Sequence, residues 1–371
     1  MFYKILNHSV EDLDFTSSNI ARKMGLTLLT NKATLHPQVF LNRQQPWPFF
    51  KGGDHDWEKS VLNPTVWREE NGVIRLFYRA VNEGPRGYFE GKYESSVGFG
   101  VSRNGIDFVR ETRPLLAATE WYENELGIED PTIIKLEGTY FLYYVAVSRS
   151  EQNERRIRIA LATSHDLKHW EKHGIVGPNA RSKSAVLFPE RVNGQIVMLY
   201  TVWTEMPESA ILIARFNSME ELKHPPKGLM DDNLKNFERN LFLGPSSRDV
   251  HKGPEVGAVP IKLRDGRWLL VICPENPHPY DAWGIAAILL DKALNVQAMV
   301  DMPLNGDLTA AERGVICDRC AFPRGALIMN RDGVEMLYIY IGTADDGAAL
   351  AYCRLDELMA AFEHDRIRSA S

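Results

Sequence analysis

The sequence predicts an all-β protein, a five-bladed β-propeller with short peripheral helices near both termini. Two observations support this prediction. Five tight turns that end in glycine recur along the chain, and an apolar run rich in β-branched and aromatic residues follows each turn. Copies of three to four short strands at a fixed period, here about 65 residues, are typical of propeller blades. An irregular β-sandwich with chance turn spacing is the alternative.

The turns are strong hairpin signals, because such pairs suit the positive φ that both central positions of a type I′ turn need. They are Asn71-Gly72, Glu137-Gly138, Asn193-Gly194, Asp265-Gly266 and Asp332-Gly333. The apolar runs that follow are Val73–Ala80, Tyr140–Val147, Ile196–Trp203, Trp268–Cys273 and Val334–Ile341. Several runs are apolar throughout, as expected of strands packed on both faces.

An X-Pro pair precedes each turn. The pairs are Asn63-Pro64, Asp130-Pro131, Phe188-Pro189, Val259-Pro260 and Phe322-Pro323. Because proline tolerates the beginning of a strand but not the middle of a ladder, the pairs predict where each innermost strand begins. Innermost strands line the central channel of a propeller, so residues beside the pairs are expected to meet at one site. These residues are Asn63, Glu129, Asp130, Phe188, Glu190 and Arg324.

The length of 371 residues suits a single all-β domain with a sizeable core. We predict one domain over residues 1–371, with blades at about 60–360 and peripheral extensions at 1–40 and 355–371. Ser9–Met24 and Leu355–Ile367 have helical patterns and are expected to pack outside the blades.

Composition and charge limit the kinds of partner that the protein is expected to bind. Hydrophobic residues make up 44% of the chain and charged residues 25%, as in ordinary soluble proteins, and the net charge is -6. A mildly acidic chain is a poor polyanion binder, so no nucleic-acid partner is expected. No apolar run approaches the roughly 20 residues that span a bilayer. The first residues are too polar for a signal peptide, which predicts a cytoplasmic protein without a membrane partner.

The cofactor signals are weak. The four cysteines form no disulfide framework, which agrees with a reducing compartment. Cys317 and Cys320 form a lone CxxC pair, whereas zinc sites usually need two such pairs or nearby histidines. There is no glycine-rich phosphate loop of the P-loop or dinucleotide type. We therefore predict neither a metal nor an organic cofactor.

Two segments carry a family resemblance. Gly127–Tyr144 (GIEDPTIIKLEGTYFLYY) resembles the GxEDPR…GTYY signature of glycoside hydrolase family 130, and Lys183–Tyr200 is similar to its KDAALFPEKINGKYVML segment. Further similar segments are Asn63–Ala80, Ser164–Gly174, Phe322–Ile328 and Ile341–Leu358. The resemblance spans roughly residues 60 to 360. It implies a five-bladed propeller and the chemistry of β-mannoside phosphorylases and a few related hydrolases.

The resemblance also implies roles for individual residues. Asp130 becomes the proton donor, which acts on the leaving group indirectly through the sugar 3-hydroxyl; the alternative is that it only caps a turn before Pro131. Phosphate is expected to contact Arg149, Arg158 and Lys183, since phosphate needs cations or N–H donors; solvated surface charge is the alternative for each. The sugar-binding candidates are Asn63, Arg79, Glu129 and Asp345, for which buried structural hydrogen bonding is the alternative.

The sequence departs from the family pattern in two places. Thr132 stands where the family has an arginine, and Ile272-Cys273-Pro274 replaces a Tyr-His-Gly motif whose histidine contacts phosphate. Both changes weaken phosphate binding. If water were the nucleophile, a carboxylate base would be needed, and Glu190, Glu255 and Glu275 are candidates among which the sequence does not choose.

The function predicted from these features is an inverting glycoside phosphorylase. It would cleave β-mannosyl, or similar β-glycosidic, oligosaccharides with inorganic phosphate as co-substrate and give α-mannose 1-phosphate. The first alternative is an inverting β-mannoside hydrolase, and the second is a non-catalytic sugar-binding propeller. The expected partners are an oligosaccharide, inorganic phosphate and, by resemblance, further copies of the chain in a homo-oligomer. Linkage, acceptor and a choice of mannose over glucose do not follow from the sequence.

Overall fold

The computed structural model describes residues 37–370 except 54, 85–86, 88–89, 153, 206–207, 245–252, 275–283, 308 and 314–319. The helix predicted over Ser9–Met24 lies outside the described residues. All elements below belong to the compact unit that spans residues 34–371.

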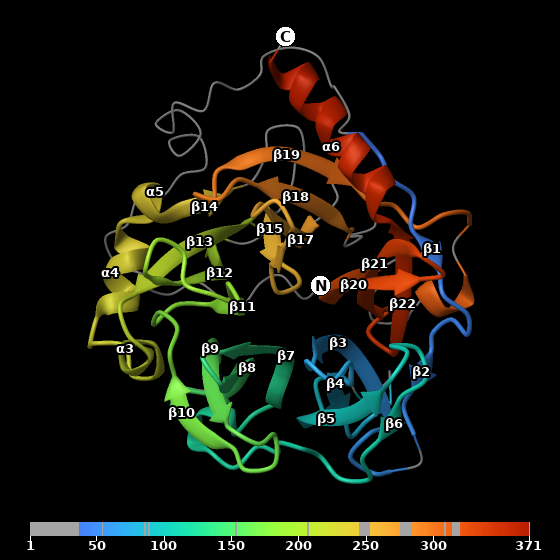
Figure 1. The fold of residues 1–371 in the computed structure, drawn as a ribbon. Coiled ribbons are helices and arrows are strands. Elements are labelled where there is room, and N and C mark those ends of the chain that lie inside the picture. Colours follow the sequence, from blue (N-terminus) through green and yellow to red (C-terminus); the bar gives the residue numbers. More distant parts are fainter. Residues whose placement is uncertain are drawn as a thin grey trace. The chain divides into compact units, whose positions relative to one another are not determined.

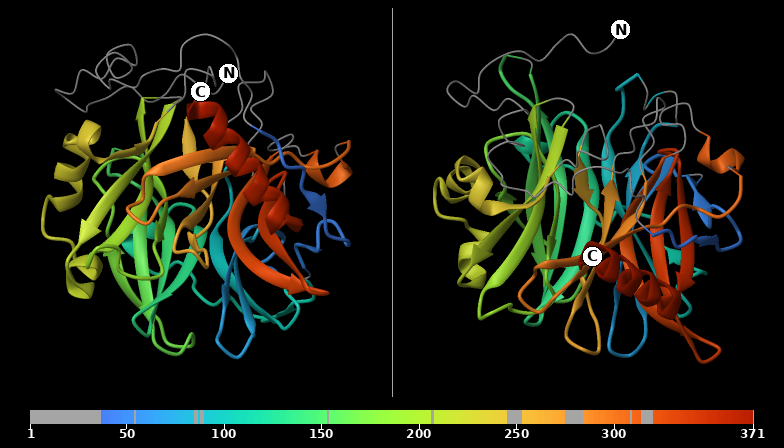
Figure 2. Two further views of the ribbon diagram at one scale, coloured as in Figure 1. Left: turned by 45° about the horizontal axis from the view of Figure 1, so that its top comes forward. Right: turned by 90° about the horizontal axis from the view of Figure 1, so that it is seen from above.

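Strands are the main regular structure in the described part of the chain, and they are hydrogen-bonded into four sheets (Figures 1 and 2). The largest sheet has two antiparallel halves that a single parallel pairing joins, between Ser95 and Gly127. One half contains β3 (Ser60–Arg68), β4 (Ile74–Val81), β5 (Ser95–Ser102) and β6 (Val109–Arg110). The other contains β7 (Gly127–Leu136), β8 (Thr139–Arg149), β9 (Arg155–Ser164) and β10 (Glu171–Ile175).

The other three sheets are wholly antiparallel. One contains β11 (Ser182–Leu187), β12 (Ile196–Glu205), β13 (Glu208–Phe216) and β14 (Leu241–Leu243). The next contains β15 (Pro254–Val256), β16 (Ile261–Lys262), β17 (Trp268–Pro274), β18 (Ala286–Leu290) and β19 (Val296–Asp301). The last contains β20 (Ala321–Arg331), β21 (Val334–Thr343) and β22 (Gly347–Arg354), to which β1 (Asn42–Arg43) and β2 (Phe50–Lys51) add from the other end of the described chain.

Helices occupy the connections. The short helices α3 (Met219–Lys223), α4 (Leu229–Lys235) and α5 (Phe237–Asn240) lie between β13 and β14. The 3-10 turns are η1 (Trp121–Glu123) and η2 (Ala310–Glu312), and α6 (Leu355–Ala370) ends the described chain. The helix predicted at Leu355–Ile367 is therefore confirmed. It packs against β19, β21 and β22 on the outside of the strands (Figure 2).

All five predicted hairpins form, with two turn geometries. Both central residues have positive φ at Glu137-Gly138, Asn193-Gly194 and Asp332-Gly333, as the type I′ prediction requires. At the first and fourth turns only Gly72 and Gly266 do. At the first turn the Glu69 N–H donates to the Val73 carbonyl, and at the fourth the Leu263 N–H donates to the Arg267 carbonyl, so each closes a three-residue loop that ends in a left-handed glycine.

Four of the five X-Pro pairs do not mark the beginning of a strand, so the prediction was wrong for them; Val259-Pro260 directly precedes β16. Pro64, Pro131 and Pro323 lie inside β3, β7 and β20, at or beside shifts in strand register. A β-bulge leaves its extra residue out of the ladder, so a proline there costs no inter-strand hydrogen bond. Phe188-Pro189 instead follows the far end of β11, and Phe188 is a core residue whose ring meets Trp268 edge-to-face at 5.0 Å.

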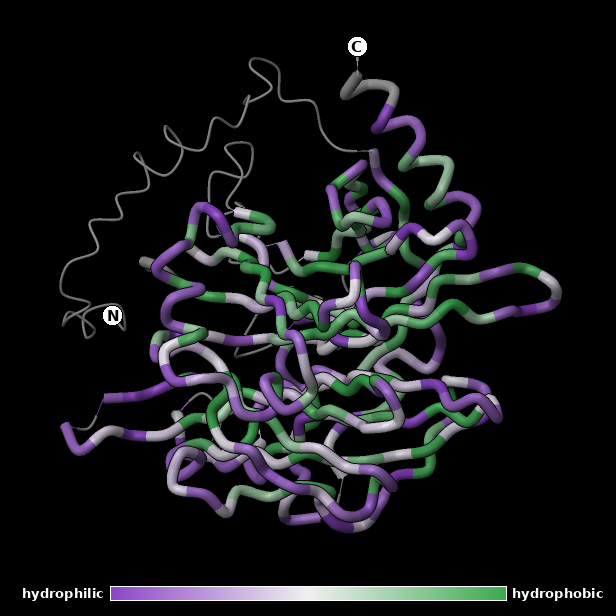
Figure 3. The backbone as a smooth tube through the Cα atoms, turned by 60° about the vertical axis from the view of Figure 1, so that its left-hand side comes forward, coloured by the Kyte–Doolittle hydropathy of each residue, from purple (hydrophilic) through white to green (hydrophobic). Residues whose placement is uncertain are grey.

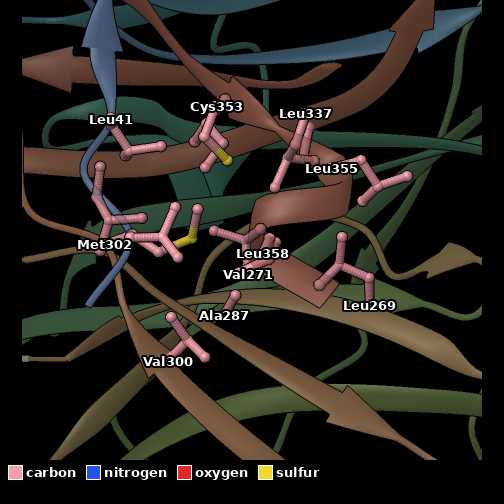
Figure 4. Packing of buried hydrophobic residues seen from close by; sticks show 14 of the residues in the cluster. Leu41, Leu269, Val271, Ala287, Val300, Met302, Leu337, Cys353, Leu355 and Leu358 are labelled. Atoms are coloured by element: carbon pink, nitrogen blue, oxygen red, sulfur yellow. The ribbon is translucent and has the colours of Figure 1, made fainter. Parts of the chain in front are cut away.

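Hydrophobic residues concentrate along the extended segments and hydrophilic residues in the connecting turns (Figure 3). The largest of the buried clusters joins β17, β18 and β21 with α6, and Figure 4 shows Leu269, Val271, Leu337 and Leu358 packed within it. Phe362 of α6 is fully buried in the same cluster. The C-terminal helix thus covers apolar strand surface that would otherwise face water.

Two further observations bear on the sequence predictions. Cys273 and Cys353 are buried and form no disulfide, whereas Cys320 is disulfide-bonded, which the cysteine spacing did not lead us to expect. Among the described residues, no helix combines the length and apolar character needed to cross a bilayer.

Removal of the Phe362 ring should test the docking of α6. We expect Phe362→Ala to lower the free energy of unfolding by about 3–5 kcal/mol, because it leaves a cavity in a closed apolar cluster. Urea unfolding followed by circular dichroism measures the change. His364→Ala, at an exposed position of the same helix, serves as the control and should change stability by less than about 0.5 kcal/mol. A Phe362→Ala protein as stable as this control would show that α6 contributes little to the core.

Candidate active site

In each of three inner strands a β-bulge directs a polar side chain toward the same point. Asn63, Asp130 and Ser184 sit where β3, β7 and β11 shift register, and their φ angles are 51°, 46° and 48°. A bulge re-aims the side chain that it carries, and a left-handed conformation is uncommon for residues other than glycine. The three side chains are buried. Figure 1 shows these strands, with β15 and β20, facing a common centre.

Asp130 is held from several strands at once. Asn63 Nδ2 donates a hydrogen bond of 2.6 Å to its Oδ1, and Arg79 Nη1 lies 3.4 Å from the same oxygen. Lys183 Nζ lies 4.0 Å from Oδ2. Among the described residues Oδ2 accepts no hydrogen bond of normal length, and it is therefore the oxygen available to a substrate hydroxyl.

The charges around Asp130 decide its protonation. Burial by itself raises the pKa of the carboxyl, but the positive charges of Arg79, Lys183 and Arg324 outweigh burial. Together with the Asn63 amide they lower the pKa of Asp130 to about 2. In the free site Asp130 is therefore ionised at neutral pH.

Arg324 supports Asp130 through the backbone. Its buried guanidinium on β20 donates from Nη2 to the carbonyl oxygen of Asp130 at 2.5 Å and from Nη1 to that of Val256 at 3.4 Å. One side chain thus links β20 to β7 and β15 and holds the carbonyl of the left-handed residue in place.

A second network fixes Arg79. Its Nη2 lies 2.6 Å from Glu129 Oε1 and 3.2 Å from the Tyr93 hydroxyl, and its Nε donates to Ser95 Oγ at 3.0 Å. Tyr93 also donates to Glu129 at 2.8 Å. A buried arginine must be paired, and here two carboxylates and two hydroxyls pair it. No sequence motif pointed to Tyr93 or Ser95.

Asp345 reaches the same centre from the turn between β21 and β22, where its φ is 52°. Burial raises its pKa to about 6; Asp130 and Glu129 add to this rise, while Arg79 and Lys183 oppose it. Two carboxyls of one site therefore differ in charge near pH 5: Asp130 is ionised and Asp345 is largely protonated.

Of the two candidate bases that the structure describes, Glu255 lies close enough to Asp130 for the charge of Asp130 to raise its pKa. Glu275 lies outside the described residues. Glu255 is buried on β15, where Ser184 Oγ donates to it at 3.5 Å, and it lies opposite Cys273 in the strand register. Burial raises the pKa of Glu255, against the lowering effect of Lys183. Glu190 lies beyond the other end of β11 from Lys183 and pairs with Lys262 at the surface, so its expected place beside the site was wrong.

The three residues predicted to contact phosphate have different partners. Lys183 lies beside Asp130 as expected. Arg149, at the end of β8, pairs with Glu125, and Arg158 on β9 donates to Asn179 at 3.2 Å. Neither contact involves Asp130. Arg181, which the sequence did not single out, stacks on Trp203 at 3.9 Å and adds positive charge near Glu255.

Three of the four predicted sugar-binding residues contact Asp130 or its neighbour, and the fourth faces them. We define the central cluster as Asn63, Arg79, Glu129, Asp130, Lys183, Glu255, Arg324 and Asp345. Asn63 Oδ1 is buried with no hydrogen-bond partner in the described structure, so it is a free acceptor for a ligand hydroxyl. Gly342 leaves room for Asn63, since a Cβ at Gly342 would come within 2.2 Å of that oxygen.

Residues 50–364 match the family model described as beta-1,4-mannooligosaccharide phosphorylase, that of glycoside hydrolase family 130. The chain belongs to glycoside hydrolase family 130. It is therefore a carbohydrate-active enzyme of the glycosidase type, and the non-catalytic alternative is set aside.

Two curated relatives from Thermoanaerobacter sp. (strain X514) are 29% identical to this chain. One is a 1,2-beta-oligomannan phosphorylase, matched over 82% of this chain and 94% of its own. The other is a beta-1,2-mannobiose phosphorylase, matched over 88% and 96%.

Solved structures share the fold. The beta-1,2-mannobiose phosphorylase from Listeria innocua superposes with a TM-score of 0.68 and 21% identity, over 88% of this chain and 99% of its own. A structure from work on family glycoside hydrolases that target beta-1,2 mannosidic linkages in Candida mannan has a TM-score of 0.66 and 21% identity, over 88% and 97%. At these identities the likeness concerns the fold alone.

The raised pKa of Asp345 predicts a stability that depends on pH. A carboxyl with a raised folded-state pKa loses stabilisation as pH climbs from its unfolded value to about 6, because the unfolded chain releases the proton more readily. We expect Asp345→Asn to be more stable than wild type at pH 7–8, by about 1–3 kcal/mol. The difference should vanish near pH 4. Thermal melts over this range measure it, with the exposed Asp332→Asn as control; a pH-independent difference would contradict the argument.

Proposed function

We propose that this protein is an inverting phosphorylase that cleaves β-mannosyl oligosaccharides with inorganic phosphate to give α-mannose 1-phosphate. The observation that carries the proposal is the placement of the Lys183 ammonium 4.0 Å from the open oxygen of the buried Asp130, in a chain of family 130. A proton carrier and a cation for the anionic nucleophile thus lie side by side. The phosphorylase activities of the two curated relatives support the same reaction.

The chemistry needs one carboxyl group. Phosphate oxygen attacks the anomeric carbon from the face opposite the leaving oxygen, the carbon–oxygen bond to that group breaks, and configuration inverts. Asp130 supplies a proton through the sugar 3-hydroxyl to the leaving oxygen, and the proton of the attacking phosphate restores Asp130. No carboxylate base is required, because phosphate is itself a nucleophile.

Asp130 must first be protonated, although it is ionised in the free site. Binding of a phosphate anion beside Lys183 offsets part of the positive charge that lowers the pKa of Asp130. Substrate binding also excludes water from Oδ2. Both changes raise the pKa toward the range in which a general acid works.

Sugar recognition falls to the remaining members of the central cluster. Asn63 Oδ1 is an unpaired acceptor, Arg79 is rigidly paired and presents a fixed donor fork, and Glu129 and Asp345 are acceptors around them. We propose a β-1,2 linkage as the preferred one, because both curated relatives act on β-1,2-linked mannosides.

We also propose that the strands form a five-bladed β-propeller. Contacts between β3 and β7, β7 and β11, β11 and β15, β17 and β20, and β20 and β3 support a closed ring. The addition of β1 and β2 to β22 joins the two ends of the described chain in one sheet, as closure of such a ring requires. A single domain, a cytoplasmic location, assembly into a homo-oligomer and activity without a cofactor complete the proposal.

A hydrolase is the second candidate, and Glu255 is the observation that favours it. An inverting hydrolase needs a second carboxylate at some distance from the acid. Glu255 is a buried carboxyl, and the negative charge of Asp130 contributes to its raised pKa. Its raised pKa weakens this candidate, because a base must be ionised to accept a proton from water.

Product analysis tests the reaction. Incubation with β-1,2-mannobiose and, in parallel, β-1,4-mannobiose should release α-mannose 1-phosphate only when inorganic phosphate is present, as followed by phosphorus NMR. Asp130→Asn, the control, should reduce the rate by about two to four orders of magnitude with an unchanged circular dichroism spectrum. Free mannose formed at a rate independent of phosphate would establish the hydrolase instead.

Lys183 should bind phosphate rather than sugar. We expect Lys183→Ala to raise the KM for phosphate by about ten- to a hundredfold, the loss of a charge-assisted contact, and the KM for the sugar by less than about threefold. Lys262→Ala, whose ammonium pairs with Glu190 away from the central cluster, is the matched control. Equal effects on both KM values would assign Lys183 to sugar binding or to structure.

A further inference from the structure

Glu255 is a buried carboxyl that lacks an ion pair. Only 1% of the residue is exposed. The hydrogen bond from Ser184 Oγ, at 3.5 Å, is long, and within the described residues no ammonium or guanidinium comes within ion-pair distance of it. An ionised carboxylate is costly in such a place, so burial raises the pKa of Glu255 and favours its protonated form.

The groups that face Glu255 come from every element packed around it. Lys183 and Ser184 lie on β11, Arg181 immediately precedes that strand, Asp130 lies on β7, Arg324 on β20 and Cys273 on β17. Thr201 on β12 accepts the backbone N–H of Val256 at 3.0 Å. Lys183, Arg324 and Arg181 favour the ionised form of Glu255, whereas Asp130 and burial oppose it, and burial is the largest effect.

Lys183 connects this carboxyl to the site of the nucleophile. Its ammonium lies beside Asp130 Oδ2, and its charge acts on Glu255 as well. Ser184, the next residue after Lys183, donates to Glu255, so we expect an anion drawn to Lys183 to lie near the Glu255 carboxyl. Next to an anion an ionised carboxylate repels, while a protonated one donates a hydrogen bond.

We propose that Glu255, in its protonated form, is a phosphate-binding residue that donates a hydrogen bond to the anion held by Lys183. The inference rests on the proposed phosphorolysis and deepens it. Ser184 positions the carboxyl by donating to its other oxygen. Cys273, directly opposite in the strand register, offers only a weak thiol donor, and the protonated Glu255 provides a stronger, neutral donor on the same side of the sheet.

The proposal predicts that phosphate binding weakens as pH rises and Glu255 ionises. The KM for phosphate should be measured from about pH 5 to about pH 9 for wild type, Glu255→Gln and Glu255→Met. Glutamine keeps a neutral donor and nearly the same shape, and methionine removes the donor. Because inorganic phosphate also titrates in this range, the difference between wild type and Glu255→Gln isolates the contribution of the carboxyl.

We expect the wild-type KM for phosphate to rise at least about tenfold more over this range than that of Glu255→Gln. Glu255→Met should have a KM raised about tenfold or more even at the lowest pH, the loss of one hydrogen bond to a charged group. Loss of more than about a hundredfold in turnover by Glu255→Gln at saturating phosphate would make Glu255 a base and overturn the proposal. So would parallel pH profiles of the two proteins.

A second measurement needs no variant. Phosphate should raise the melting temperature of wild type more at low pH than at high pH. The reference is the rise produced by sulfate, an anion that does not titrate in this range. A ratio of the phosphate rise to the sulfate rise that stays the same at every pH would overturn the proposal. Failure of the proposed function looks different, since wild type would then release free mannose without any phosphate requirement.

Discussion

Asp130 carries its negative charge in a buried position, and that charge sets demands on much of the surrounding fold. A carboxylate removed from water is stable only beside compensating charges and donors. Arg79, Lys183, Arg324 and the Asn63 amide meet this need from β4, β11, β20 and β3. No single hairpin could supply them. Strands from separate sheets must therefore be brought to one point, and the tight turns and apolar faces of the strands serve to hold them there.

The same environment gives different protonation states to neighbouring carboxyls. Asp130 lies within reach of three cations and is ionised, whereas the balance of charges leaves Asp345 and Glu255 dominated by burial, which raises the pKa of each. This difference in protonation favours the binding of an anion, because an ionised carboxylate repels phosphate and a protonated carboxyl does not. It also provides a group that can take up a proton when the charge of the site changes.

The fold does not choose between phosphate and water as nucleophile. The beta-1,2-mannobiose phosphorylase and the structure from the work on family glycoside hydrolases superpose on this chain with nearly equal TM-scores, 0.68 and 0.66. The choice must come from the side chains on the nucleophile side of Asp130, where Lys183, Glu255 and Cys273 meet. Lys183 supplies a cation there, and Cys273 stands where the family motif has a histidine. Glu255, a buried carboxyl, lies opposite Cys273 in the strand register.

The sequence by itself determined the hairpins, through glycine at turns that need positive φ, and it identified Asp130 and Lys183 through motifs that follow one another along the chain. It could not determine which glutamate accompanies them. Glu190 and Lys183 are only seven positions apart, but they lie at opposite ends of β11. Glu255 lies on a strand of another sheet and contacts Ser184. The bulges that aim Asn63, Asp130 and Ser184 inward, and the pairing of Arg79 by Tyr93 and Ser95, likewise depend on strand register and depth. Spacing along a chain does not encode these quantities, because they are fixed only when separate sheets pack together.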